Sequence, residues 1–310
     1  MNKTELQQHK QLPSKDERHK LFGSVEPGPR TKPVDKSKMA DLQNSREDFL
    51  FNIDMVGISN VKHPITIPSQ MIPEIQTTIG TFSFGSSITQ GSKGTNMSRF
   101  TEQLDKYHRE GFAIDLTTLK SFTEELAGRL KQSDAEVEVS FPWFFERRGP
   151  YSDLAGMNHA DATIRVEYDK ETGHDVTCTL TGTITTLCPC SKEISEYSAH
   201  NQRGNVTMSV KLTDDFDEQE TDWKAALLEA AESNASARIH PVLKRPDEKM
   251  VTEQAYENPR FVEDIVRLVA ADLYEYDFVE TFEVSCRNEE SIHLHDAVAT
   301  LSYDKKQEIK

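Results

Sequence analysis

The chain has 310 residues, of which 36% are hydrophobic and 28% charged, so it is long enough for one large or two ordinary globular domains. Its formal net charge is -16 and its pI is about 5.1, which argues against general affinity for nucleic acid or an anionic membrane, because both require many Lys and Arg side chains. The sequence contains no run of about 18 apolar residues, so no transmembrane helix is expected. Residues 1–20 are polar and lack the apolar core of a secretory signal. Four cysteines in such a chain indicate reduced thiols in the cytoplasm.

Residues 1–47 contain a Pro- and Gly-rich stretch and no apolar periodicity, so they are predicted to form a mobile N-terminal tail. After this tail, apolar spacing predicts strands and helices in the order strands 51–59 and 75–88, helices 98–110 and 116–132, strands 135–144 and 159–168. The second part of the chain is predicted as strands 176–185 and 205–212, helices 222–233 and 259–273, strands 278–287 and 297–303.

The predicted order β-β-α-α-β-β therefore occurs twice, although the two halves share no visible sequence identity. We expect a first half over residues 48–172 and a second half over residues 173–310. Pairs of strands that alternate with pairs of helices are typical of an α+β fold with antiparallel sheets and with helices layered on one face. A doubly wound parallel sheet would instead alternate single strands with single helices.

The segment from Leu187 to Arg203 directly follows a predicted strand, is predicted to form a loop, and concentrates chemically active side chains. Cys188 and His200 are ligand types that suit Zn²⁺ or Fe²⁺. Two inert buried thiols or a small structural zinc knuckle would give a similar pattern. A structural zinc site takes four Cys or His ligands, whereas three protein ligands and an open position indicate catalysis.

Two acidic residues farther along the chain are further candidates. Glu248 lies in a segment with Pro and both charge signs, where a solvated loop or the start of a helix is the simpler interpretation. Glu263 is predicted in the first turn of a helix, where an acid can simply stabilise the positive end of the helix dipole.

His293 and His295 are two residues apart, so both rings would lie on one face if residues 291–297 were extended. Histidines so placed can bind a metal or transfer protons, but an exposed loop pair has the same sequence pattern. The nearby cations are ordinary surface residues, or phosphate clamps if they converge: Lys192, Arg203, Lys244 and Arg245.

Several of these segments together resemble the signature of the type IB GTP cyclohydrolases. The resemblance rests on Leu187-Cys-Pro-Cys-Ser-Lys-Glu-Ile, Ala199-His-Asn-Gln-Arg, Ser140-Phe-Pro-Trp-Phe, Asn258-Pro-Arg-Phe-Val-Glu-Asp and Ser291-Ile-His-Leu-His. A further match, Lys93-Gly-Thr-Asn-Met-Ser-Arg-Phe, departs from the family at Asn96, where the family has His. The likeness spans roughly residues 48–303.

The resemblance implies a tandem (bimodular) tunnelling fold and a homotetramer with active sites at subunit interfaces. It also implies one divalent metal per active site, either Zn, Fe or Mn, held by Cys188, His200 and Glu248. Glu263 would anchor the guanine edge of the substrate GTP, and His293, His295 and the nearby thiol of Cys190 would serve catalysis. Lys192, Arg203 and Arg245 would hold the triphosphate.

The reaction implied by this resemblance is the first step of tetrahydrofolate biosynthesis. Metal-bound water would attack guanine C8, ring opening would release formate, and the ribose would rearrange to give 7,8-dihydroneopterin triphosphate. Two alternatives stay open. A tunnelling-fold nitrile reductase would use a nucleophilic Cys and NADPH, and a zinc-stabilised binding module would have a closed four-ligand site without catalysis.

Overall fold

A computed structural model describes residues 12–23, 28–43 and 45–309. Residues 43–310 form one compact unit and residues 1–42 form another. In the smaller unit, helix α1 (Lys15–Phe22) begins after Ser14, whose side chain and backbone bond reciprocally with Glu17, and no residue of α1 is buried. A short 3-10 helix, η1, covers Lys36–Lys38. The predicted mobility of residues 1–47 stays a prediction, and residues 1–11 lie outside the described ranges.

Eight antiparallel strands form one sheet in which every strand pairs with its neighbours in sequence, in the order β1 to β8. The strands are β1 (Ile53–Pro68), β2 (Ile75–Ile88), β3 (Asp134–Arg148), β4 (Ala155–Asp169), β5 (Gly173–Leu187), β6 (Asn201–Leu212), β7 (Val279–Glu289) and β8 (Ala297–Asp304). The helices are α2 (Ser98–Arg109), α3 (Leu116–Leu130), α4 (Pro189–Ile194), α5 (Trp223–Ser233), α6 (Arg245–Glu257) and α7 (Val262–Glu275), and η2 (Lys305–Ile309) follows β8.

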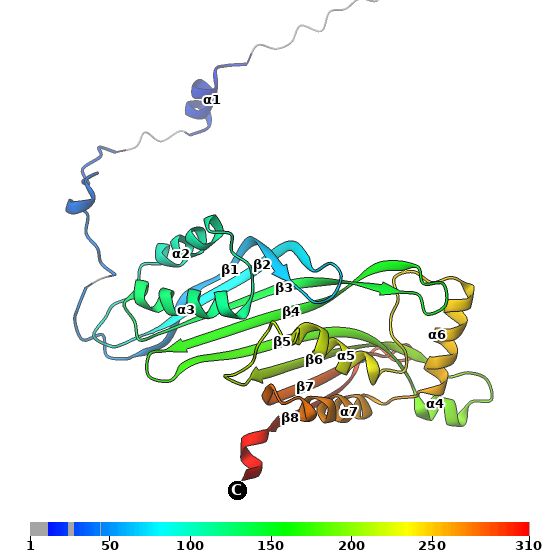
Figure 1. Ribbon diagram of the computed structural model, residues 1–310. Helices are drawn as coiled ribbons and strands as arrows, with labels where there is room; N and C mark the ends of the chain where they lie inside the picture. The colour runs from blue at the N-terminus through cyan, green and yellow to red at the C-terminus, as the bar shows by residue number, and fades with distance from the viewer. Residues whose placement is uncertain (1–11, 24–27, 44, 310) are drawn as a thin grey trace, which may run out of the picture. The chain divides into compact units, whose positions relative to one another are not determined.

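Helices α2, α3, α5 and α7 lie over one face of the sheet (Figure 1). This arrangement confirms the α+β prediction, with antiparallel strands and helices layered on one face. Two strands, two covering helices and two strands occur twice along the chain, the element order expected from the sequence. The second repeat also carries α4 and α6. The boundary expected near residue 172 falls in the turn between β4 and β5, where Asp169 pairs with Gly173.

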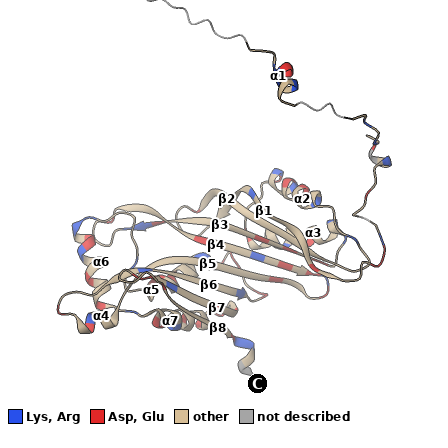
Figure 2. Cartoon of the chain, turned by 180° about the vertical axis from the view of Figure 1, so that it is seen from behind, with Lys and Arg blue, Asp and Glu red and all other residues tan. Residues whose placement is uncertain are grey.

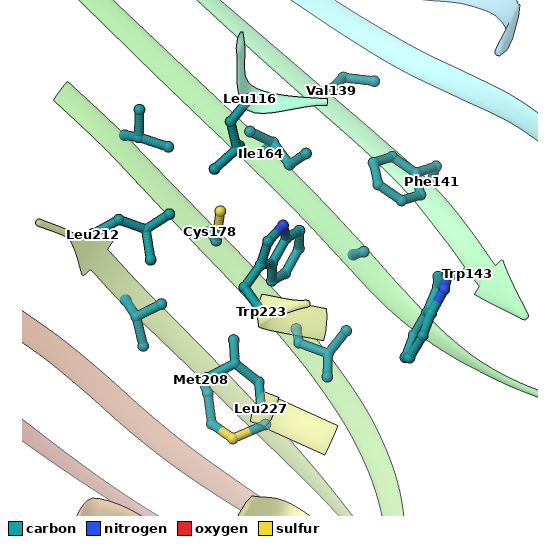
Figure 3. Packing of buried hydrophobic residues seen from close by; sticks show 14 of the residues in the cluster. Leu116, Val139, Phe141, Trp143, Ile164, Cys178, Met208, Leu212, Trp223 and Leu227 are labelled. Carbon is teal, nitrogen blue, oxygen red and sulfur yellow. The ribbon is translucent and has the colours of Figure 1, made fainter. Parts of the chain in front are cut away.

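The core lies between the sheet and these helices, because alternate residues of each strand point to that face. Figure 3 shows the sheet side of this core, formed by Val139, Phe141 and Trp143 of β3, Ile164 of β4, Cys178 of β5 and Met208 of β6. These side chains lie against Leu116 of α3 and against Trp223 and Leu227 of α5. Trp143 and Trp223 are fully buried. Burial raises the pKa of the Cys178 thiol, so this cysteine serves as a small core residue.

The opposite face of the sheet is turned toward the viewer in Figure 2, which shows acidic and basic residues along its strands. A hollow on it is lined by acidic residues from β1, β3, β4 and β5, namely Asp54, Asp134, Glu136, Glu167, Asp169 and Asp175. Thr177, Thr179, Thr181 and Thr183 alternate along β5 with its buried residues. Part of the net negative charge of the chain therefore lies on the face of the sheet opposite helices α2, α3, α5 and α7.

A buried polar cluster joins the two repeats. The Lys224 ammonium lies 2.8 Å from Asp222, and both side chains are only 3% exposed. Asp222 also accepts hydrogen bonds from the Ser69 hydroxyl and the Gln70 backbone N–H, both on the β1–β2 connection. A buried ion pair needs such additional bonds to offset the cost of removing its charges from water.

The sheet divides near its middle, and this division positions the candidate site. β4 pairs with β5 only between Asp161 and Asp169, while β5 continues to Leu187 beside β6. Beyond the division, residues 236–239 occupy the free side of β5: Thr185 and Ala237 form a bridge, and the Asn158 side chain of β4 donates to the Ile239 carbonyl at 2.8 Å. The end of β5 therefore lies beside residues 236–239 of the second repeat, which in turn contact β4 of the first repeat.

Candidate active site

The candidate site begins where β5 ends at Leu187. Cys188 is the N-terminal cap of α4, and its sulfur accepts the Ser191 N–H at 3.4 Å. Pro189 at the first helical position needs no hydrogen-bond partner there, so the sequence favours a helix start at this point. The segment was predicted as a loop, and that prediction is wrong for residues 189–194 because the single turn of α4 is too short to show apolar periodicity. All four cysteines are free.

The structure brings Cys188 and His200 together. The Cys188 N–H donates to the His200 carbonyl at 3.1 Å, and the His200 N–H donates to the Ser191 hydroxyl at 3.2 Å. The chain between them forms α4 and a turn that returns to the start of β6. Backbone hydrogen bonds thus hold two of the three predicted metal ligands, Cys188 and His200, next to each other.

Two side chains lie near Nδ1 of the His200 ring, and the sequence analysis identified neither of them. Gln202 Oε1 lies 3.0 Å from His200 Nδ1, and Gln202 Nε2 donates to the Thr186 hydroxyl at 3.1 Å. Glu290 Oε2 lies 3.9 Å from the same Nδ1, and the Glu290 side chain is 12% exposed. β6 begins at Asn201, four residues before the predicted strand 205–212, so strand periodicity gave no signal for Gln202.

The third predicted ligand, Glu248, is not assembled with this pair. It is exposed in the first turn of α6, so of the two simpler interpretations, a solvated loop or the start of a helix, the structure shows the helix start. α6 packs through Ala255 and Val251 against Leu187. Glu248 precedes Ala255 by seven residues, or about 10 Å along the helix. Within the described ranges, no three His, Cys, Asp or Glu side chains are arranged to hold a metal ion together.

Asp247, beside Glu248, attaches the start of α6 to the β3–β4 turn. Its carboxylate is fully buried and accepts backbone N–H groups of Tyr151 at 2.7 Å, Ser152 at 2.8 Å and Lys244 at 2.8 Å. Burial opposes ionisation, but the hydrogen bonds from Ser152, Lys244 and Tyr151 prevail and hold the pKa of Asp247 far below its usual range. The first turn of α6, with Glu248 and Arg245, is therefore fixed to the first repeat.

Replacing Asp247 by Asn should lower the melting temperature in a pH-dependent manner. A depressed folded-state pKa contributes stability that is present above the unfolded value of about 3.9 and is lost as the pH falls toward the folded value. The deficit of the variant should thus be full at pH 6–7 and shrink below about pH 4. Thermal unfolding across this range would measure it, with Asp153→Asn, an exposed acid of the same turn, as control. A deficit independent of pH would contradict this role.

Glu263 lies in the first turn of α7, as predicted, and it is exposed. Its neighbour Asp264 accepts the Phe261 N–H at 2.9 Å and so caps the helix, which leaves Glu263 without this structural task. The Arg260 N–H donates to the Leu187 carbonyl at 3.0 Å. This bond places the start of α7 beside the end of β5 and therefore beside Cys188.

His293 and His295 lie in the connection between β7 and β8, which is bent rather than extended. Their side chains nevertheless share one side, because the two rings stack with centroids 4.7 Å apart and planes 14° apart. The backbone of residues 291–296 is thus not extended, although Ile292 and Leu294 alternate with polar residues as they would in a strand. Glu290 connects this segment to the His200 ring.

The predicted phosphate-binding cations lie on three different elements. Lys192 of α4 donates to the Tyr256 carbonyl at 2.6 Å and lies 4.5 Å from the centre of the Tyr256 ring, which ties α4 to α6. Arg203 of β6 is exposed and lines a hollow with His159 and Asn158 at the division of the sheet. Arg245 is exposed at the start of α6, and Cys190 is exposed on α4.

Residues 39–299 match the family described as "Type I GTP cyclohydrolase folE2". The chain belongs to this family. Curated relatives with the name GTP cyclohydrolase FolE2 include proteins of Oceanobacillus iheyensis, 68% identical over 96% of this chain and 99% of that protein, and Halalkalibacterium halodurans, 59% identical over 96% and 99%. The protein of Bacillus subtilis is 54% identical over 97% of this chain and 99% of its own length.

Among solved structures, this FolE2 family member is similar to the uricase of Arthrobacter globiformis, with a TM-score of 0.48 and 10% sequence identity over 82% of this chain and 94% of the uricase. A urate oxidase from Bacillus sp. TB-90 gives a TM-score of 0.48 at 8% identity over 82% of this chain and the full length of that chain. None of the helices in the described ranges is long and apolar enough to cross a membrane.

The donor types at the end of β5 fit the divalent metal expected for a FolE2 family member. A free, half-buried thiol and an imidazole whose Nδ1 is engaged by Gln202 are both ligand types that suit Zn²⁺ or Fe²⁺. The fit covers Cys188 and His200. The contribution of Glu248 stays a prediction, as do the roles of the other candidate residues.

Proposed function

We propose that this protein is a metal-dependent GTP cyclohydrolase that converts GTP and water to formate and 7,8-dihydroneopterin triphosphate, the first step of tetrahydrofolate biosynthesis. The observation that carries the proposal is the family match over residues 39–299, which includes the Cys188–His200 pair. One divalent ion, Zn, Fe or Mn, would be held by Cys188, His200 and Glu248. It would supply Lewis acidity, which makes water a nucleophile near neutral pH.

In this proposal Glu263 recognises the guanine base. Its exposed carboxylate, free of the capping task that Asp264 performs, would accept hydrogen bonds from guanine N1–H and the 2-amino group. Adenine has no N1–H and would leave the acceptor unpaired, which disfavours it. Lys192, Arg203 and Arg245 would bind the triphosphate, and the thiol of Cys190 would lie close to the reaction.

His293 and His295 would transfer protons during ring opening and ribose rearrangement. Their rings are exposed and stacked on the β7–β8 connection, so both can face the same substrate. Glu290 lies on the same connection, beside the His200 ring. Proton transfer by positioned imidazoles is the common form of general acid–base catalysis near neutral pH.

The test of the function combines the ratio of metal to protein with an assay of formate release. A cyclohydrolase should bind one metal per chain, release formate from GTP, and stop when a chelator removes the metal. A nitrile reductase with a nucleophilic Cys would retain its activity with the chelator, and a closed structural zinc site would release no formate. Either result would contradict the proposal.

We further propose that the working form is a homotetramer with active sites at subunit interfaces. β1 and β8 each pair with only one strand in the described ranges, and unpaired strand edges favour pairing with another chain. Large apolar side chains beside the candidate site are exposed, namely Ile194, Tyr197, Ile292 and Leu294. A second copy that covers them could bring further residues to Cys188 and His200. Light scattering should give four times the mass of the chain, and a monomeric active enzyme would contradict this.

Replacing Glu263 by Gln should weaken GTP binding by about 1–3 kcal/mol, because an amide N–H would then face the N–H groups of guanine. The measurement is KM or substrate affinity together with bound metal, which should not change. Glu257→Gln, an exposed acid at the end of α6, is the matched control. If Glu263→Gln lost its metal instead, Glu263 and Glu248 would have exchanged roles.

A further inference from the structure

Gln202 connects the His200 ring to Thr186. Gln202 lies on β6 directly opposite Thr186 of β5, and it is 9% exposed. Its Nε2 donates to the Thr186 hydroxyl at 3.1 Å, and Thr186 is fully buried. With the nitrogen turned toward Thr186, the carbonyl oxygen Oε1 faces His200.

An amide oxygen can only accept, so in this orientation of the Gln202 amide the 3.0 Å contact to His200 Nδ1 corresponds to a proton on that nitrogen. A neutral imidazole then has its lone pair on Nε2. The other neighbour of Nδ1, the Glu290 carboxylate at 3.9 Å, lies beyond hydrogen-bond distance. Gln202 is therefore the side chain within hydrogen-bond distance of His200 Nδ1.

Hydrogen bonds hold the backbone of His200 on both sides. The carbonyl of His200 accepts the Cys188 N–H, and its own N–H is bonded to Ser191. The side chain of His200 is 16% exposed. The remaining variable is rotation of the ring and the position of its proton, and the Thr186–Gln202 pair restricts both.

We propose that Gln202, held by Thr186, is a positioning residue that keeps the His200 ring in the Nδ1–H form and thereby presents a bare Nε2 as a metal ligand. This inference rests on the proposed function, because it assumes a metal at Cys188 and His200. Histidine ligands commonly donate their second ring N–H to a protein acceptor, and loss of that acceptor typically weakens metal binding by about 10–100-fold.

The first experiment measures Zn²⁺ affinity of the metal-stripped, full-length protein by competition with a chromophoric chelator. Gln202→Leu removes the acceptor and should bind Zn²⁺ about 10–100-fold more weakly. Gln202→Glu retains an acceptor oxygen and should restore most of the affinity. Gln76→Leu is the matched control, because Gln76 is a buried glutamine whose amide bonds only to the Phe144 backbone on another part of the sheet.

The second experiment observes the tautomer itself. Long-range ¹H–¹⁵N correlation spectra of histidine-labelled, metal-free protein should show His200 as the Nδ1–H form in the unaltered protein and a shift toward the Nε2–H form in Gln202→Leu. Thr186→Val keeps Gln202 but frees its amide, so it should give a mixture of the two forms and an intermediate Zn²⁺ affinity. This variant also provides the test if Gln202→Leu does not fold.

The two proposals fail in different ways. If the unaltered protein binds none of Zn²⁺, Fe²⁺ and Mn²⁺, the metal-dependent function is wrong. If the unaltered protein binds Zn²⁺ and Gln202→Leu binds it equally well with an unchanged tautomer, the function stands and the role of Gln202 is overturned.

Discussion

Replacing Cys188 by Ala is expected to abolish formate release from GTP and to lower the metal bound by the purified protein. Cys188 caps α4 and is joined through its backbone to His200, so its thiol is half of the only predicted ligand pair that the described chain assembles. Alanine at this position removes a soft anionic donor and leaves at most two predicted ligands, too few for a stable catalytic zinc site. Bound metal, measured by elemental analysis, and formate should fall together.

Cys190→Ala is the matched control for metal content. Cys190 is two residues away on the same short helix, is exposed, and is not a predicted ligand. This variant should keep its metal, whatever its effect on turnover. If Cys188→Ala retained full metal and full formate release, Cys188 would not be a ligand and the site would have to be sought elsewhere.

Most of the sheet could be predicted from the sequence because its strands alternate apolar and polar residues. β2 begins and ends where predicted, at Ile75 and Ile88, and the paired helices over each half were found from their apolar spacing. β1 was predicted to end at residue 59 but continues to Pro68. The second half of β1 contains Pro64. An edge strand tolerates proline, but in a sequence pattern proline indicates the end of a strand.

Helix α6 was missed for a different physical reason. Only Asp247 and Ala255 of this helix are buried, so it shows no apolar stripe. It is held instead by the bonds between Asp247 and the β3–β4 turn, which join residues almost a hundred positions apart in sequence. Contacts of this kind leave no local pattern.

The candidate site shows the same contrast. The spacing of Cys188 and His200 within one short segment predicted a pair that the backbone brings together. Glu290 lies in the connection between β7 and β8, far from His200 in sequence, and the two residues become neighbours only when the sheet forms. Glu248 lies on the helix that sequence patterns did not reveal, which is why the sequence could name it only through a family resemblance.

Removal of the more important of His293 and His295 is expected to lower kcat by about 10²–10⁴-fold without loss of metal, the usual contribution of general acid–base catalysis. The stacked rings lie on an exposed connection and are not needed to complete the predicted set of Cys188, His200 and Glu248. Ring opening and ribose rearrangement both require proton transfer, which imidazoles supply near neutral pH. We expect the larger effect from His293, which stands nearer the start of the Ser-Ile-His motif and nearer Glu290 in sequence.

Single alanine variants would be assayed for bound metal, formate and the final pterin, since a defect in ribose rearrangement would allow formate release and still reduce the pterin. His108→Ala, an exposed histidine on α2, controls for the general effect of removing an imidazole. Unchanged turnover in both variants would exclude the two histidines from the mechanism. Loss of metal from either one would make that histidine a ligand, and the third position beside Cys188 and His200 would then belong to the β7–β8 connection in place of α6.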